Sequence, residues 1–147
     1  FGWVANDAIF GTIPGVSTLR RRLRRARFLS RTVRERGRFM APLDSGASLI
    51  GMTPHDVVAA PYHRNNAGNL AMYRFFLAPP ERARTIAAEW DVDYVAICPS
   101  SFTEIDLARE GPGSLALGLR EGRAPRWLEP VPLGEGRLRV WRVKPAP

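Results

Sequence analysis

Cysteine, histidine and long apolar runs are all scarce in this sequence. Among 147 residues there is one cysteine, Cys98, which excludes an internal disulfide and a cysteine-rich zinc site. No apolar run approaches the ~20 residues that a membrane-spanning helix needs. The first 16 residues lack the basic start of a signal peptide and carry Asp7. The chain begins with Phe1 rather than Met, so we expect a fragment or a processed product.

Catalytic motifs are also missing from the sequence. There is no Walker loop, no glycine fingerprint after a strand, and no HExxH, CxxC or Gly-x-Ser-x-Gly pattern. A Ser/His/Asp triad can be written from Ser45, His63 and Asp44, but any three turns of a sheet supply such a set. His55, His63 and Asp56 do not have the spacing of metal ligands. We therefore predict no metal, no cofactor and no catalysis by the chain in isolation.

Positive charge is concentrated at the start of the chain. The net charge is +8, and residues 1–38 hold ten arginines against two acids. Residues 39–147 hold twelve basic and twelve acidic residues. The body of the protein is therefore neutral, which argues against a broad nucleic-acid surface. We divide the chain into a basic N-terminal arm, residues 1–37, and a domain of residues 38–147.

The arm is predicted to form a basic amphipathic helix. Ser17 or Thr18 can cap a helix that runs to about Arg36 and stops at Gly37. Its apolar positions recur at helical spacing, with arginines on the other faces. Residues 19–36 are then a solvated arm, a helix that binds anionic lipid, or a nucleic-acid arm. The last is disfavoured because no aromatic residues interleave with the arginines.

The domain alternates apolar runs with helical patterns. Strands are predicted from residue 39 to 43, 56 to 60 and 93 to 98, followed by a hairpin of 127–131 and 137–143 around Gly134-Glu135-Gly136. Helices are predicted near 47–52, 66–77, 81–90, 104–109 and 115–121. This order predicts a three-layer, Rossmann-like α/β domain with an open sheet. Three parallel strands would be joined at one edge by the antiparallel C-terminal hairpin.

The densest polar segment follows the second predicted strand. In an open parallel sheet, ligands bind at the carboxyl ends of the strands, where three turns should converge. Arg64 would pair with a phosphate or carboxylate, and the amides and hydroxyls would bind a polyhydroxylated ligand. The predicted ligand-binding residues are Asp44, Ser45, Tyr62, His63, Arg64, Asn65, Asn66 and Ser101.

Each of these residues also has a purely structural interpretation. His63 can donate to a backbone carbonyl and shape its turn, and Arg64 can pair with Asp44. Asn65 and Asn66 are common turn formers, and Asp44 can simply cap a helix. The two interpretations remain open at the level of sequence.

Several segments together resemble a known family. They are Met40 to Gly46, Thr53 to Asn65, Asp93-Tyr94-Val95 and Trp127-Leu128, of which Pro61-Tyr62-His63-Arg64-Asn65 is the most specific. They look like the soluble C-terminal domain of bacterial multi-spanning membrane proteins related to C-type, polyprenyl-phosphate-sugar-dependent glycosyltransferases. The likeness covers residues 38–147.

The resemblance implies a non-catalytic accessory domain at the periplasmic face of a membrane. Its partners would be the membrane portion of a parent protein and a polyprenyl-phosphate sugar or a glycan or peptide acceptor. An arginine-rich helix is usually kept in the cytoplasm, so residues 1–37 depart from this pattern and a cytoplasmic location is the alternative. Two other functions stay open: a small hydrolase or transferase with His63 as general base, and an interaction module that docks through the basic helix.

Overall fold

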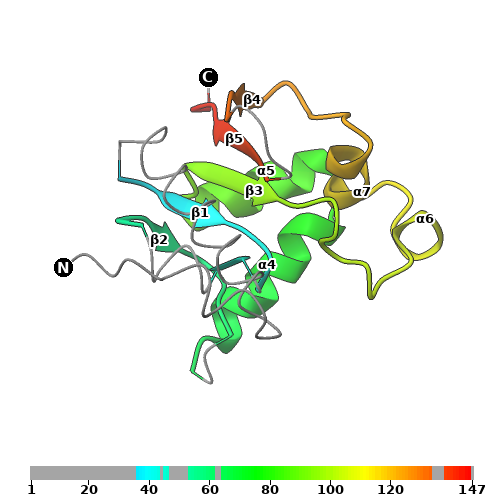
Figure 1. The fold of residues 1–147 in the computed structure, drawn as a ribbon, viewed down its shortest axis with the longest axis horizontal. Helices are drawn as coiled ribbons and strands as arrows, with labels where there is room; N and C mark the ends of the chain where they lie inside the picture. The colour runs from blue at the N-terminus through cyan, green and yellow to red at the C-terminus, as the bar shows by residue number, and fades with distance from the viewer. Residues whose placement is uncertain (1–35, 44, 47–52, 62–63, 134–137, 147) are drawn as a thin grey trace, which may run out of the picture.

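The computed structural model describes residues 36–43, 45–46, 53–61, 64–133 and 138–146 (Figure 1). The predicted basic helix of the arm, the short helix at 47–52 and the hairpin turn at 134–136 lie outside these residues. Among the described residues, no helix is both long enough and apolar enough to cross a bilayer.

The described strands form one mixed five-stranded sheet. They are β1 (Arg38–Met40), β2 (Asp56–Val57), β3 (Tyr94–Ile97), β4 (Leu128–Val131) and β5 (Arg139–Val143), in the spatial order β2-β1-β3-β5-β4. β1 pairs in parallel with both β2 and β3, whereas β5 is antiparallel to β3 and to β4. The predicted α/β class with a mixed sheet is therefore confirmed.

The C-terminal strands join the sheet in an order that the sequence did not predict. The last strand, β5, lies beside β3, and β4 forms the outer edge. The chain therefore forms the edge strand, β4, before it forms β5, which lies between β4 and β3. This order gives β5 two neighbours, so Val140 and Trp141 are buried on opposite faces of the sheet.

The second strand is shorter than predicted. The apolar run continues to Ala60, but β2 ends at Val57. Beyond that point the Val58 N–H still donates to the Phe39 carbonyl of β1 at 2.9 Å, but the next polar contacts are made with the segment that leads into α4. The Val58 carbonyl accepts a hydrogen bond from the Asn65 side chain, and the Ala60 N–H donates to Asn69. Val58, Ala59 and Ala60 are all buried, although they lie outside the strand.

The structure describes four helices, and local signals mark the start of three of them. They are α4 (Asn66–Leu77), α5 (Pro80–Glu89), α6 (Leu107–Glu110) and α7 (Leu115–Arg120). Pro80 occupies the first turn of α5, where its missing N–H costs nothing. Ser114 caps α7 by accepting from the Leu117 N–H at 3.3 Å, as predicted. Asp106 caps α6 through the Arg109 N–H, so that helix begins later than predicted.

The two faces of the sheet differ in what covers them. Every described helix contributes buried side chains to one core, which Met40, Val95, Ile97 and Trp141 supply from the sheet. The opposite face is also apolar and buried, through Phe39, Ala41, Tyr94, Ala96 and Val140. Figure 1 shows α4 and α5 on the same side of the sheet. The described residues thus form two of the three predicted layers, which are the sheet and the helices on one of its faces.

Candidate functional site

The strand order creates a switch point at β1. The chain passes from β1 to β2 on one side and later to β3 on the other, so β1 is flanked by both in parallel. The carboxyl end of β1 lies beside β3, with Met40 opposite Val95, and β3 continues in the same direction to Ile97. Ligands of open α/β sheets bind beyond such paired ends. We call the turns that follow β1, β2 and β3 the carboxyl edge.

The first two turns of the carboxyl edge touch through their backbones. The N–H groups of Ser45 and Gly46 both donate to the Pro42 carbonyl at 3.0 Å, which folds the chain back after β1. A Cβ atom at Gly46 would lie 1.9 Å from the Ala59 carbonyl oxygen. Only glycine allows this approach without a shift of the backbone. The turn that carries Ser45 therefore lies directly against the end of the run that follows β2.

Asn65 fixes the second turn to the start of α4. Its side-chain amide donates to the Val58 carbonyl at 2.9 Å and to the Asn69 side chain at 3.2 Å. The Asn69 side chain in turn accepts from the Ala60 N–H. Asn65 precedes α4 but makes no side-chain cap bond to it. Its amide is therefore committed to holding the turn, which favours the structural interpretation of this residue.

Replacing Asn65 with alanine should lower the free energy of unfolding by about 1–3 kcal/mol, because the Val58 carbonyl would lose its partner. The matched control is Asn66→Ala at the next position, which is exposed and begins α4. That change should stay within about 0.5 kcal/mol. Urea unfolding of both variants measures the difference. Equal stabilities would show that the Asn65 amide does not hold the turn.

Arg64 and Asn66 face solvent at the carboxyl edge. Both are exposed and flank the half-buried Asn65. Ser101, in the third turn, has the opposite character. It is 4% exposed, and its hydroxyl accepts from the Cys98 N–H at 3.1 Å. The third turn is held against α4 by Phe102, whose ring lies 5.1 Å from that of Phe76.

Three of the predicted site residues, Asp44, Tyr62 and His63, lie outside the described residues. The Asp44–Arg64 pair and the Ser45/His63/Asp44 triad therefore remain predictions, as do the ligand roles of the other five residues. The structure brings the Ser45 turn against Ala59, and it places Arg64, Asn65 and Asn66 at the start of α4. Ser101 lies instead next to Phe102, whose ring packs against Tyr73 and Phe76 in the C-terminal half of α4.

Neither the models of known protein families nor the curated proteins match this chain. A likeness appears among solved structures. The fold resembles the C-terminal globular domain of an oligosaccharyltransferase from Archaeoglobus fulgidus. The two superpose with a TM-score of 0.58 at 14% identity, covering 74% of this chain and 86% of that one. At this level of identity the likeness shows a shared fold.

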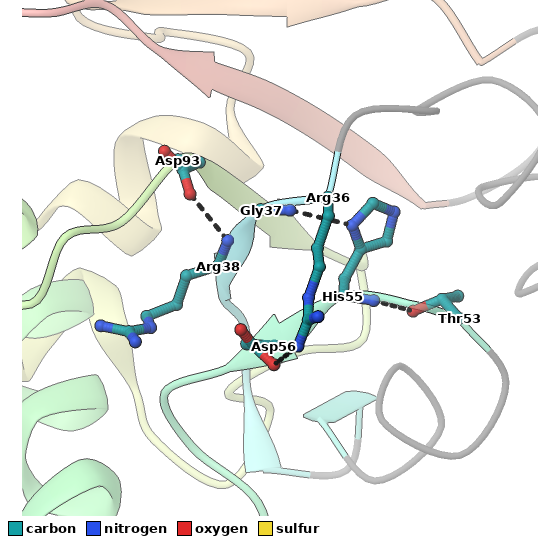
Figure 2. Close-up of polar contacts among 7 residues, drawn as sticks. All are labelled: Arg36, Gly37, Arg38, Thr53, His55, Asp56 and Asp93. Atoms are coloured by element: carbon teal, nitrogen blue, oxygen red, sulfur yellow. Dashed lines mark hydrogen bonds and ion pairs between the residues drawn. The ribbon is translucent and has the colours of Figure 1, made fainter.

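His55 has a structural role at the opposite end of the strands. It is 3% exposed, and its Nδ1 accepts a hydrogen bond from the Gly37 N–H at 3.3 Å (Figure 2). Its ring packs on those of Phe39 and Tyr94, with centroids 5.0 and 6.1 Å away. Within the described residues, no three His, Cys, Asp or Glu side chains cluster as metal ligands do. His55 joins the loop before β2 to the apolar second face of the sheet.

Polar residues at the amino ends of β1 and β3 form a second cluster, which sequence reasoning missed. Asp93 accepts from the Arg38 N–H at 2.8 Å, and the Arg38 guanidinium donates to the Trp90 carbonyl at the end of α5. Arg36 pairs with Asp56 at 3.3 Å. The alternating basic residues of β5 were the one sequence signal for this cluster. They predicted a solvent-exposed face of the strand but not which residues lie next to it.

Proposed function

We propose that this chain is an accessory domain of a bacterial, membrane-embedded glycosyltransferase-like protein and acts at its extracytoplasmic face. The observation that supports this is the fold likeness to the C-terminal globular domain of an oligosaccharyltransferase, which this chain covers over 86% of its length. The independent resemblance of Thr53 to Asn65 to C-terminal domains of that class supports the same assignment.

The domain recognises its ligand at the carboxyl edge. The ligand is an acceptor or a lipid-linked sugar phosphate held next to the membrane portion of the parent protein. Arg64 is exposed and precedes Asn65, whose amide is bonded to the Val58 carbonyl, so its guanidinium is presented next to an anchored residue. A guanidinium binds a phosphate through two parallel hydrogen bonds. The described groups of this edge bind and orient a ligand, and the chemical step belongs to the parent protein.

The test is a titration of the isotopically labelled chain with a short-chain polyprenyl-phosphate sugar, followed by amide NMR shifts. Shifts should concentrate at residues 45–46 and 64–66. Arg64→Gln should weaken binding roughly tenfold or more, because a hydrogen bond to a charged group is worth about 1.5–3 kcal/mol. Arg74→Gln, an exposed arginine farther along α4, is the matched control and should bind normally. Unmoved amides at both turns, with shifts elsewhere, would contradict the proposal.

A further inference from the structure

The amino ends of the parallel strands border a groove of about 560 Å³. Its walls come from the segment before β1, residues 84–88 of α5, the turn before β3 and the end of β5 with the residues after it. We call it the amino-edge groove. Its charged lining residues are Arg36, Arg84, Asp91, Asp93, Arg142 and Lys144. The volume lies within the ~300–1,000 Å³ of small-ligand sites.

Four cations converge on this groove from three separate parts of the chain. Arg36 precedes β1, Arg84 lies on α5, and Arg142 and Lys144 come from the end of the chain. These cations come together only when the chain folds, so the cluster differs from a run of charged residues on one exposed segment. Like charges brought together repel one another, and that repulsion is relieved when an anion binds between them.

The groove is lined by four cations and only two acids, Asp91 and Asp93. Asp93 accepts the Arg38 N–H at 2.8 Å and so helps to join β1 to β3 (Figure 2). Arg36 points instead to Asp56, and this pair is largely exposed, at 72% and 54% of the two side chains. Among the described residues, neither Arg84 nor Lys144 has an ion-pair partner. These two cations are therefore available to a bound anion.

One cation is held in place by an aromatic ring. The Arg142 guanidinium carbon lies 5.6 Å from the centroid of the Tyr94 ring, within the distance of a cation–π contact. Tyr94 is itself 3% exposed and stacks on Phe39, with centroids 4.9 Å apart. A guanidinium fixed over a rigid ring loses little freedom when it binds a ligand.

The arginine-rich arm enters the domain at the same place. Ten arginines lie between residues 1 and 38, and the chain passes through Arg36, on the groove's wall, into β1. The point of attachment is fixed by chain connectivity. This junction lies at the opposite ends of the strands from Arg64.

We propose that the amino-edge groove binds a phosphate-bearing group, with Arg84, Arg142 and Lys144 as its ligands. The group is either a headgroup of an anionic phospholipid or a soluble diphosphate, since both offer the same oxygens to the same cations. This site is independent of the carboxyl edge, and a failure of either proposal leaves the other standing.

The test compares two double variants of the full chain that lose the same charge. Arg84→Gln with Lys144→Gln removes two groove cations, and Arg109→Gln with Arg120→Gln removes two exposed arginines from α6 and α7. Every variant keeps the arm, so non-specific attraction to it is the same throughout. Amide NMR shifts with inorganic pyrophosphate form one arm of the test. Co-sedimentation with vesicles of phosphatidylglycerol, against phosphatidylcholine alone, forms the other.

In at least one arm, the groove variant should bind roughly 30-fold more weakly than the wild type, at about 1 kcal/mol for each cation lost. The matched variant should bind almost normally, and wild-type shifts with pyrophosphate should include residues 91–94 and 142–144. A loss confined to vesicles identifies the lipid headgroup, and a loss with pyrophosphate identifies the soluble group. Equal losses in the two double variants, or no loss in either arm, would overturn the proposal.

Discussion

Replacing Gly46 with alanine is expected to lower the free energy of unfolding by about 3 kcal/mol, at the upper end of the usual cost of overpacking. The added Cβ would lie 1.9 Å from the Ala59 carbonyl oxygen and 3.0 Å from its carbon. Both are backbone atoms, so no side-chain rotation relieves the overlap. Two turns of the carboxyl edge would have to separate. Urea unfolding followed by circular dichroism measures the loss.

The control for this prediction is the same substitution at Gly113. A Cβ at Gly113 would meet no atom within 4 Å, so alanine there should change stability by no more than about 0.5 kcal/mol. The carboxyl edge should also lose order in Gly46→Ala, with amide shifts that reach Ala59 and Ala60. A Gly46→Ala variant as stable as Gly113→Ala would show that the two turns are not in direct contact.

Helices were predictable here because their signals are local. Pro80 begins α5, and Ser114 caps α7 as its sequence position indicates. β3 was predictable as well, because all four of its residues are apolar or aromatic and all are buried. Such features depend on neighbours within one or two turns of chain, so the sequence alone reveals them.

The sheet order and the role of Asn65 were not predictable in the same way. The insertion of β5 between β3 and β4 depends on pairing between segments more than 40 residues apart. From the sequence, Asn65 could be a helix cap, a turn former or a ligand-binding amide. Its hydrogen bond to the Val58 carbonyl, which only the structure shows, distinguishes these roles. The amino-edge groove is harder still, because its cations come from three segments that show no common pattern.

The two edges of the sheet suit different tasks. The carboxyl edge presents Arg64 beside a turn braced by amides, which suits recognition of one oriented ligand. The amino-edge groove combines several cations with the entry of the arginine-rich arm, which suits attraction to a dense negative charge. Because the strands separate the two edges, both can be occupied at once. Substitutions at the two edges should therefore have additive effects on the free energy of binding.

The second large effect is expected at Phe102, which anchors the third turn of the carboxyl edge. It is 3% exposed, and its ring lies 5.1 Å from that of Phe76 and 6.3 Å from that of Tyr73. Phe102→Ala removes this contact between the end of β3 and α4. The cost should be about 3–5 kcal/mol, as for other buried aromatic residues cut back to alanine. Thermal or urea unfolding measures it, and Leu70→Ala, on the exposed side of α4, should cost far less.

Phe102 also has a positive φ of 60°, a backbone conformation that favours glycine. Phe102→Gly loses the same ring but relieves the strain that alanine would keep. We therefore expect the glycine variant to be more stable than the alanine variant by about 1 kcal/mol, although glycine is ordinarily the more destabilising of the two. The reverse order would show that this turn relaxes once the ring is gone. In that case, packing of the ring is what holds Phe102 in its left-handed conformation.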